Sequence, residues 1–354
     1  MCFTRLPEYS MMAAHCVNLR EIESLVWLKF LVCVAVILFS GIKLARYGDA
    51  IGEKTGLGGA WIGLLLLAAI TSMPELVTGV SSAALVGVPD LAMGTLLGSC
   101  IVNLAILALL DTIYRPAPIL SRASLSHMAS AGLGILLAVI TAGAIFGGKT
   151  ISGLSLGWVG IPSIIILLVY LVGVRQMFYS ERRRHSALPA AHLQYKDISA
   201  RAVYTRFTLA SIAVIGAGIW LSFIGDEIAE TYSWSASFVG SLFLAITSSM
   251  PELVVTIAAL HLGAIDMAVA DILGSNMFNI AVIFPVDLFY SRGPLLSMVS
   301  SAHLITAAIT VVMNLIVIAG LRFPQRRKVL FVSWYDIALI GLYIFGAYAL
   351  YSYS

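Results

Sequence analysis

The sequence predicts an all-α polytopic membrane protein with ten transmembrane helices, arranged as two inverted five-helix repeats. Its composition is the first reason, because 60% of the 354 residues are hydrophobic, only 11% are charged and the mean hydropathy is +0.97. Soluble domains carry about 25% charged residues, so this composition excludes a soluble globular protein. The other two reasons are a series of long apolar runs and a motif that occurs twice.

Ten apolar runs are each long enough to cross a hydrocarbon core of about 30 Å, which takes about 20 helical residues. We expect helices because only helices satisfy all backbone polar groups inside a lipid-exposed segment, and the alternating pattern of a membrane barrel is not visible. The runs cover residues 25–46, 57–84, 90–113, 127–147, 152–174, 206–229, 236–261, 266–290, 301–321 and 332–353.

The basic residues predict the orientation of these spans. Lys and Arg are concentrated between the fifth and sixth spans and between the ninth and tenth. The positive-inside rule places these loops in the cytoplasm and both termini outside, and the expected location is the cell (inner) membrane. The basic 176–204 segment is interpreted as a topology anchor, although it could also bind acidic lipid.

The expected organisation has four segments: an N-terminal tail (1–24), a first repeat (25–175), a basic cytoplasmic linker (176–204) and a second repeat (205–354). The tail lacks the pattern of a signal peptide and is interpreted as a short extramembrane segment or an early start codon. The chain shows no zinc-spaced histidine pair, no paired cysteine spacing and no nucleophile elbow. We therefore expect no enzyme, no resident cofactor and no nucleic-acid partner, and no protein partner is identified.

The duplicated motif is TSMPE at residues 71–75 and SSMPE at residues 248–252, an offset of 177 residues. After the loss of one residue, an offset of 176 continues the alignment. It matches Asp90, Gly98, Ser99, Asn103 and Asp111 with Asp266, Gly274, Ser275, Asn279 and Asp287. Each copy contains five spans, an odd number, so the copies enter the membrane in opposite orientations. Inverted repeats of this kind are typical of secondary transporters with a site near the midplane.

The motif itself predicts a cation site. A carboxylate at membrane depth costs at least ~2.5 to 3.5 kcal/mol, so Glu75 and Glu252 need a cation or a proton. Pro74 and Pro251 lack an N–H group and collide with the carbonyl four residues earlier, so each helix is expected to break beside its carboxylate. Carboxylates, hydroxyls and freed carbonyls are hard oxygen ligands of the kind that calcium prefers and sodium accepts.

The third and eighth spans are expected to complete the site. Ser99 and Asn103 are four residues apart on one helix face, as are Ser275 and Asn279, and the glycine before each serine permits close approach of another backbone. The apolar residues between them are interpreted as packing residues. A proline that only kinks a helix and a hydroxyl that bonds its own helix are the structural alternatives for each group alone.

Other polar residues are less clear from the sequence. Asp271 aligns with Thr95 and breaks the symmetry, so it could be a third acidic ligand, a proton site, a loop-facing residue or a structurally paired one. Asp111 and Asp287, near helix ends, are expected to be solvated at the interface or to interact with those ends. His127 and His303 are expected to be interfacial.

The two motifs, each followed by a Gly-Ser segment, resemble the alpha-repeats of the sodium/calcium exchanger family within the cation/calcium antiporter superfamily. The resemblance implies that spans 2, 3, 7 and 8 enclose the ions while spans 1 and 6 slide against that core. It also implies a set of ion ligands in which two alanines offer backbone carbonyls. The implied ligands are Ala68, Thr71, Ser72, Glu75, Ser99, Asn103, Ala245, Ser248, Ser249, Glu252, Ser275 and Asn279.

The function that the resemblance implies is a secondary active antiporter that exchanges calcium for sodium by alternating access. Ca²⁺ and Na⁺ would be its substrates, and membrane lipid would surround it. Asn279 occupies a position that is aspartate in some sodium-coupled members of the family. Coupling to protons, as in calcium/proton exchangers, is therefore the alternative.

Overall fold

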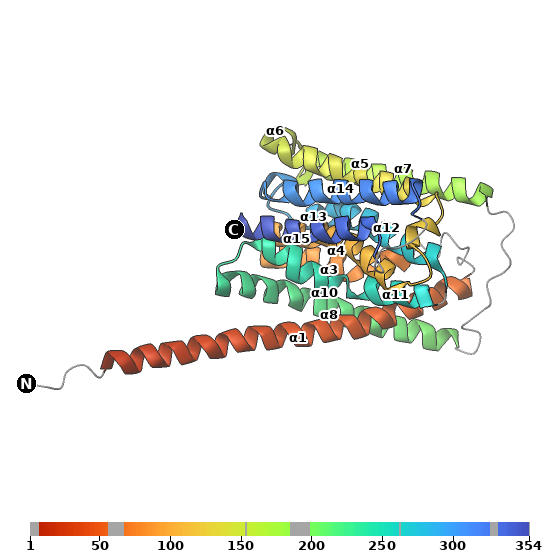
Figure 1. Ribbon diagram of the computed structural model, residues 1–354. Helices are drawn as coiled ribbons and strands as arrows, with labels where there is room; N and C mark the ends of the chain where they lie inside the picture. Colours follow the sequence, from red (N-terminus) through yellow and green to blue (C-terminus); the bar gives the residue numbers. More distant parts are fainter. Residues whose placement is uncertain are drawn as a thin grey trace, which may run out of the picture.

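The computed structural model describes residues 7–55, 67–152, 154–184, 199–261, 263–325 and 332–353, and these are mostly helical (Figure 1). In the first repeat the elements are α1 (Pro7–Thr55), helical residues 67–71, α3 (Met73–Ser81), η1 (Ser82–Val86), α4 (Pro89–Ile113), η2 (Ile119–Ser121), α5 (His127–Phe146), α6 (Gly148–Ser152), β1 (Ser155–Leu156), β2 (Val159–Gly160) and α7 (Ile161–Arg184). In the second repeat they are α8 (Ala200–Tyr232), α9 (Ala236–Val239), η3 (Gly240–Leu244), α10 (Ala245–Ser248), α11 (Met250–His261), α12 (Ile265–Ala281), α13 (Ile283–Phe289), η4 (Leu295–Ser297), α14 (His303–Arg322) and α15 (Trp334–Ser352).

The described helices account for the predicted spans. Eight of them are long and apolar enough to cross a membrane, and the bent pair Ala236–Ser248 and Met250–His261 makes a ninth. The remaining predicted span, 57–84, is described from residue 67 onward as residues 67–71, α3 and η1. The predicted all-α fold of ten transmembrane helices in two inverted repeats is confirmed.

Matching contacts between the repeats show the inversion directly. Asp90, at the start of α4, lies 3.1 Å from Nε2 of His303, and Asp266, at the start of α12, lies 3.0 Å from Nε2 of His127. The same offset of 176 residues relates both members of the two pairs. Both histidines are buried at the first residue of their helices, so they join the repeats to each other.

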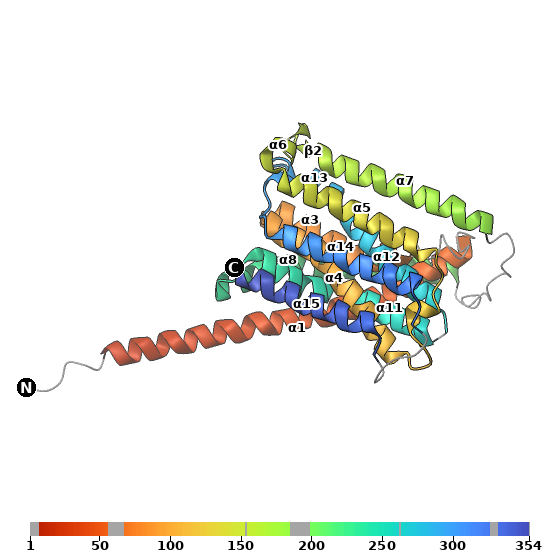
Figure 2. The ribbon, with the colours of Figure 1, turned by 45° about the horizontal axis from the view of Figure 1, so that its top comes forward.

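The interior of the bundle is formed by α4 and α12, whose residues are mostly buried, whereas α1, α7 and α15 are largely exposed. Figures 1 and 2 show α7 at one edge of the bundle and α1 at the opposite edge, where it projects past the other helices. α1 packs along α8, and Lys29 Nζ lies 2.7 Å from Glu227 Oε1 between them. The central position of α4 and α12 places their polar residues away from lipid.

Three segment boundaries can be compared with the structure. α1 is helical from Pro7, within the predicted tail, and α7 and α8 extend into the predicted 176–204 linker, of which residues 185–198 lie outside the described ranges. The fifth span was expected from residue 152 but begins at Ile161. The antiparallel β1–β2 hairpin precedes it, and Gly157 in its turn has a positive φ of 68°. Apolar composition does not distinguish this hairpin from a helix start.

Asp111, near the C-terminal end of α4, is fully buried and not solvated at an interface. It accepts hydrogen bonds from Ser333 Oγ (2.7 Å), from the hydroxyl of Tyr335 (2.7 Å) and from the backbone N–H of Ile119. These donors come from the loop after α4 and from the start of α15. The carboxylate therefore anchors a loop of the first repeat to the last helix of the second.

Asp287, its repeat partner on α13, is buried in the same way. It accepts from the backbone N–H of Leu295 (2.7 Å), from the backbone N–H of Gly160 (2.7 Å) and from the hydroxyl of Ser163. It thus joins a loop of the second repeat to the start of α7 in the first. The expectation of interfacial solvation was wrong for both residues, because each carboxylate has donors from two segments that the sequence does not show as neighbours.

Candidate functional site

Both motif-bearing helices break where the sequence predicts. Ser72 (φ −84°, ψ 13°) and Ser249 (φ −83°, ψ 6°) have almost the same non-helical backbone conformation. Helix resumes at the next residue, with Pro74 in the first turn of α3 and Pro251 in the first turn of α11. The second break bends its span by 42°. Proline is tolerated there because the first turn of a helix needs no donor from it.

The two breaks face each other and exchange hydrogen bonds. Ser72 Oγ donates to Glu252 Oε1 at 2.7 Å, and Ser249 Oγ donates to Glu75 Oε1 at 2.9 Å. Each repeat thus supplies the donor for the carboxylate of the other. All four side chains are at most 1% exposed. The second oxygen of each carboxylate has no hydrogen-bond partner among the described residues, which leaves a buried acceptor on each side.

α4 and α12 form the walls of this site through the predicted glycine contacts. A Cβ placed on Gly98 would lie 2.5 Å from Cα of Ser241, and one placed on Gly274 would lie 3.0 Å from Cβ of Ala68. Helices therefore approach each other more closely than larger residues would allow. The expectation of close backbone approach is confirmed at Gly98, whereas Gly274 faces the methyl group of Ala68.

Several predicted ligands contact one another. Ser99 Oγ lies 3.4 Å from Ser248 Oγ. Thr71 Oγ1 donates to the carbonyl of Ala68 at 3.1 Å, and Ser248 Oγ donates to the carbonyl of Ala245 at 3.3 Å. Each of these carbonyls also accepts a backbone N–H, so a cation would have to replace or share the hydroxyl contact.

Asn103, Ser275 and Asn279 are also fully buried. Their side-chain polar atoms have no hydrogen-bond partner in the described parts of the chain. Buried polar groups normally have partners, because a lost hydrogen bond at such a place costs about 1 to 3 kcal/mol. These atoms are therefore available to a ligand, although the structure gives no hydrogen bond between them and the two glutamates.

Asn276, between Ser275 and Asn279, was assigned no role from the sequence. Asn276 is buried, and neither atom of its amide has a partner among the residues that the structure describes. Its backbone carbonyl accepts from Sγ of Cys100 at 3.6 Å, and the repeat offset aligns these two residues. A polar amide inside an apolar span was the available signal.

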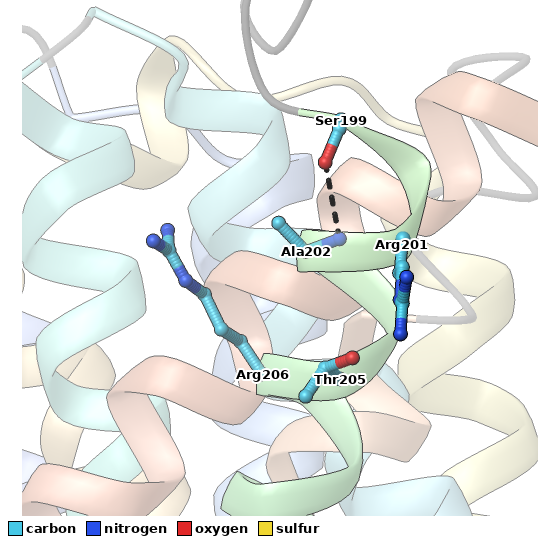
Figure 3. Close-up of a pocket in the computed structure, with 5 residues that line it drawn as sticks. All are labelled: Ser199, Arg201, Ala202, Thr205 and Arg206. Carbon is cyan, nitrogen blue, oxygen red and sulfur yellow. Dashed lines mark hydrogen bonds between the residues drawn. The ribbon is translucent and has the colours of Figure 1, made fainter.

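A separate pocket of about 360 Å³ lies at the start of α8 and has no residue in common with the site above (Figure 3). Ser199 caps the helix, its Oγ accepting from the backbone N–H of Ala202 at 3.3 Å. Arg201, Thr205 and Arg206 complete the lining and are exposed. Ser199, Arg201 and Ala202 lie in the 176–204 segment, which was interpreted as a topology anchor, and Thr205 and Arg206 follow it directly.

Comparisons with known proteins give the family. A family model described as sodium/calcium exchanger protein matches residues 25–175 and 203–353, one match in each repeat. The inner membrane protein YrbG of Escherichia coli is 24% identical over 74% of this chain and 79% of its own length. The membrane protein MJ0091 of Methanocaldococcus jannaschii is 26% identical over 85% of this chain and 95% of its own. The sodium/calcium exchanger MaX1 of Methanosarcina acetivorans is 27% identical over 41% of this chain and 39% of its own.

Solved structures agree on the fold. The sodium-calcium exchanger NCX_Mj superposes with a TM-score of 0.59 at 19% identity, covering 91% of this chain and 97% of its own. An H⁺/Ca²⁺ exchanger, CAX, superposes with a TM-score of 0.70 at 13% identity, covering 98% and 91%. The fold and the match over both repeats lead to the same conclusion: this chain belongs to the sodium/calcium exchanger protein family.

Proposed function

We propose that this protein is a secondary active cation antiporter that exchanges calcium for sodium by alternating access. The observation that carries the proposal is the reciprocal pair of hydrogen bonds, Ser72 to Glu252 and Ser249 to Glu75, between two broken helices of opposite orientation. Two buried carboxylates, each with one oxygen lacking a partner in the described structure, need positive charge between them. The chemistry is ion binding and release, and no covalent step is part of it.

The residues of the site are suited to a hard cation. Glu75 and Glu252 together supply two negative charges, which balance one Ca²⁺. Each serine hydroxyl has one hydrogen to donate and two lone pairs, so Ser72 and Ser249 can coordinate a cation while they still hold the opposite carboxylate. Calcium prefers six to eight oxygen ligands, and the twelve residues proposed from the sequence are enough to supply that number. Sodium accepts the same ligands, and the two ions compete.

Alternating access follows from this competition and from the inversion of the repeats. α3 and α11 enter the site from opposite sides of the membrane, so the same ligands can be reached from either side in turn. α1 and α8 pack together beside this core and would move against it. If only ion-occupied states change orientation, the gradient of one ion drives the transport of the other ion in the opposite direction.

For the arrangement in the membrane, we propose the topology given by the basic residues. Both termini lie outside, the 176–204 linker is cytoplasmic and the two repeats occupy residues 25–175 and 205–354 in the cell (inner) membrane. The basic pocket at the start of α8 then lies on the cytoplasmic side, as expected for a topology anchor.

The test is calcium uptake into proteoliposomes driven by an imposed sodium gradient. Glu75→Gln and Glu252→Gln should each abolish uptake, because each removes one of two buried charges that the ion needs. Thr310→Val is the matched control, since the hydroxyl of Thr310 bonds only its own helix, at the carbonyl of Thr306 (2.9 Å). Calcium uptake in the absence of sodium would contradict the coupling to sodium. Uptake driven by a pH gradient alone would establish a calcium/proton exchanger instead.

A further inference from the structure

Asp271 is a third carboxylate in the interior of the protein, and its environment differs from that of the two glutamates. It is 1% exposed, and neither of its oxygens has a hydrogen-bond partner among the residues that the structure describes. Glu75 and Glu252 each have a serine donor, and Asp287 has three donors. An ionised carboxylate only accepts hydrogen bonds, so Asp271 is left with no described source of compensation.

Its place on α12 directs it to the cation site. Asp271, Ser275 and Asn279 are spaced four residues apart, so they form one row along a single face of the helix. Four residues of helix correspond to about 6 Å. Asp271 also acts electrostatically on Glu252, which shows that the two carboxylates are near each other. The spacing on α12 puts Asp271 one helical turn before Ser275, which is one of the proposed ligands.

The first repeat gives a direct comparison for this position. Thr95 aligns with Asp271, and it begins the matching row with Ser99 and Asn103 on α4. The hydroxyl of Thr95 donates to the carbonyl of Leu91 at 2.9 Å, so its own helix satisfies it. An ionised carboxylate has no hydrogen to donate to the carbonyl of its own helix. The substitution of a self-satisfied hydroxyl by an unpaired acid, in a wall of the proposed site, points to a positive ligand at Asp271.

We propose that Asp271 is a cation ligand that forms a separate, monovalent cation position on the cytoplasmic side of the Glu75–Glu252 site, and that sodium binds there. The inference rests on the proposed function and on the proposed topology, in which α12 enters from the cytoplasmic side. One carboxylate and the neighbouring hydroxyl of Ser275 provide too few oxygens for the six to eight ligands of calcium, whereas they suit a single charge. With Asp271 the site contains three carboxylates, so a monovalent cation at Asp271 could be held in addition to an ion between Glu75 and Glu252.

Direct binding tests this position separately from transport. The purified protein in detergent is titrated with ²²Na⁺ and, in parallel, with ⁴⁵Ca²⁺, and the bound ions per protein are counted at saturation. Asp271→Asn should lose one bound sodium per protein and at least about tenfold in apparent sodium affinity, because an amide replaces the only charged ligand. Calcium binding through Glu75 and Glu252 should persist at the same stoichiometry, which also shows that the variant is folded.

The controls separate the two proposals. Thr95→Val, at the matched position of the first repeat, should keep the wild-type number of bound sodium ions. Asp271→Glu should keep the sodium ion at position 271, because it keeps the charge. Should Asp271→Asn fail to fold, Asp271→Thr, which copies the first repeat, should show the same loss of one sodium. A wild-type sodium count and affinity in a folded, uncharged variant would overturn the inference and leave the proposed function intact. Calcium binding that survives in Glu75→Gln and Glu252→Gln would overturn both.

Discussion

The two repeats make matching hydrogen bonds at their broken helices and at their buried aspartate anchors, but they differ at one position of the third and eighth spans. Ser72 and Ser249 donate to opposite carboxylates at 2.7 and 2.9 Å, and Asp111 and Asp287 each anchor two segments. By contrast, Thr95 satisfies itself within α4, whereas its partner Asp271 has no described donor. In the proposed function, these matched contacts hold a site that each side of the membrane reaches in turn. The unmatched position makes the two approaches to that site chemically different.

The largest effect is expected at the matched anchors. Asp111→Ala and Asp287→Ala each leave three buried donors without their acceptor, and each lost bond to a charged group is worth about 1.5 to 3 kcal/mol. We expect either variant to lose about 3 kcal/mol or more of stability, and the two losses to be similar. The melting temperature of the purified protein, followed by intrinsic fluorescence, is the measurement. A large loss in one repeat only would show that the anchors are not equivalent.

A smaller effect is expected from the cross-repeat serines. Ser72→Ala removes the donor to Glu252 and Ser249→Ala the donor to Glu75, each worth about 1.5 to 3 kcal/mol. The apparent affinity for calcium should fall by about 10- to 100-fold in both variants. ⁴⁵Ca²⁺ binding measures it. Thr247→Val is the neighbouring control, because the hydroxyl of Thr247 bonds only the carbonyl of Phe243 in its own span (2.7 Å), and its affinity should stay at the wild-type value.

Substitution of the matched glycines of α4 and α12 should destabilise the protein to different extents. A Cβ on Gly98 would meet the backbone of Ser241 at 2.5 Å, whereas one on Gly274 would meet the methyl group of Ala68 at 3.0 Å. Overpacking costs about 1 to 3 kcal/mol, and backbone yields less than a side chain. Gly98→Ala should therefore lower the melting temperature more than Gly274→Ala. Gly132→Ala on α5, where nothing lies within 4 Å, should not lower it, and equal losses at Gly98 and Gly274 would contradict the reported geometry.

Local patterns in the sequence were sufficient for the spans, the inversion, the breaks at Pro74 and Pro251 and the close backbone approach at Gly98. They did not predict that Ser72 would bond the carboxylate of the other repeat, because that contact depends on how two helices 180 residues apart are placed. The anchors were missed for the same reason. A helix-end aspartate at an interface and one buried beneath a loop have the same sequence context, and only the distant donors distinguish them.

The smallest effect is expected at Tyr335, where the two anchors differ in chemistry. The hydroxyl of Tyr335 donates to Asp111 at 2.7 Å and accepts from the backbone N–H of Leu120 at 3.3 Å, while the described donors to Asp287 are two backbone N–H groups and a serine. Tyr335→Phe keeps the ring and removes one of the three described donors to Asp111, so we expect a loss of about 1.5 kcal/mol, the lower end for a bond to a charged group and below the loss in Asp111→Ala. In the double variant with Asp111→Ala the loss should be less than the sum, because both changes break the same bond. Additive losses in this thermal-melting cycle would show that the hydroxyl acts independently of Asp111, through its contact with the N–H of Leu120.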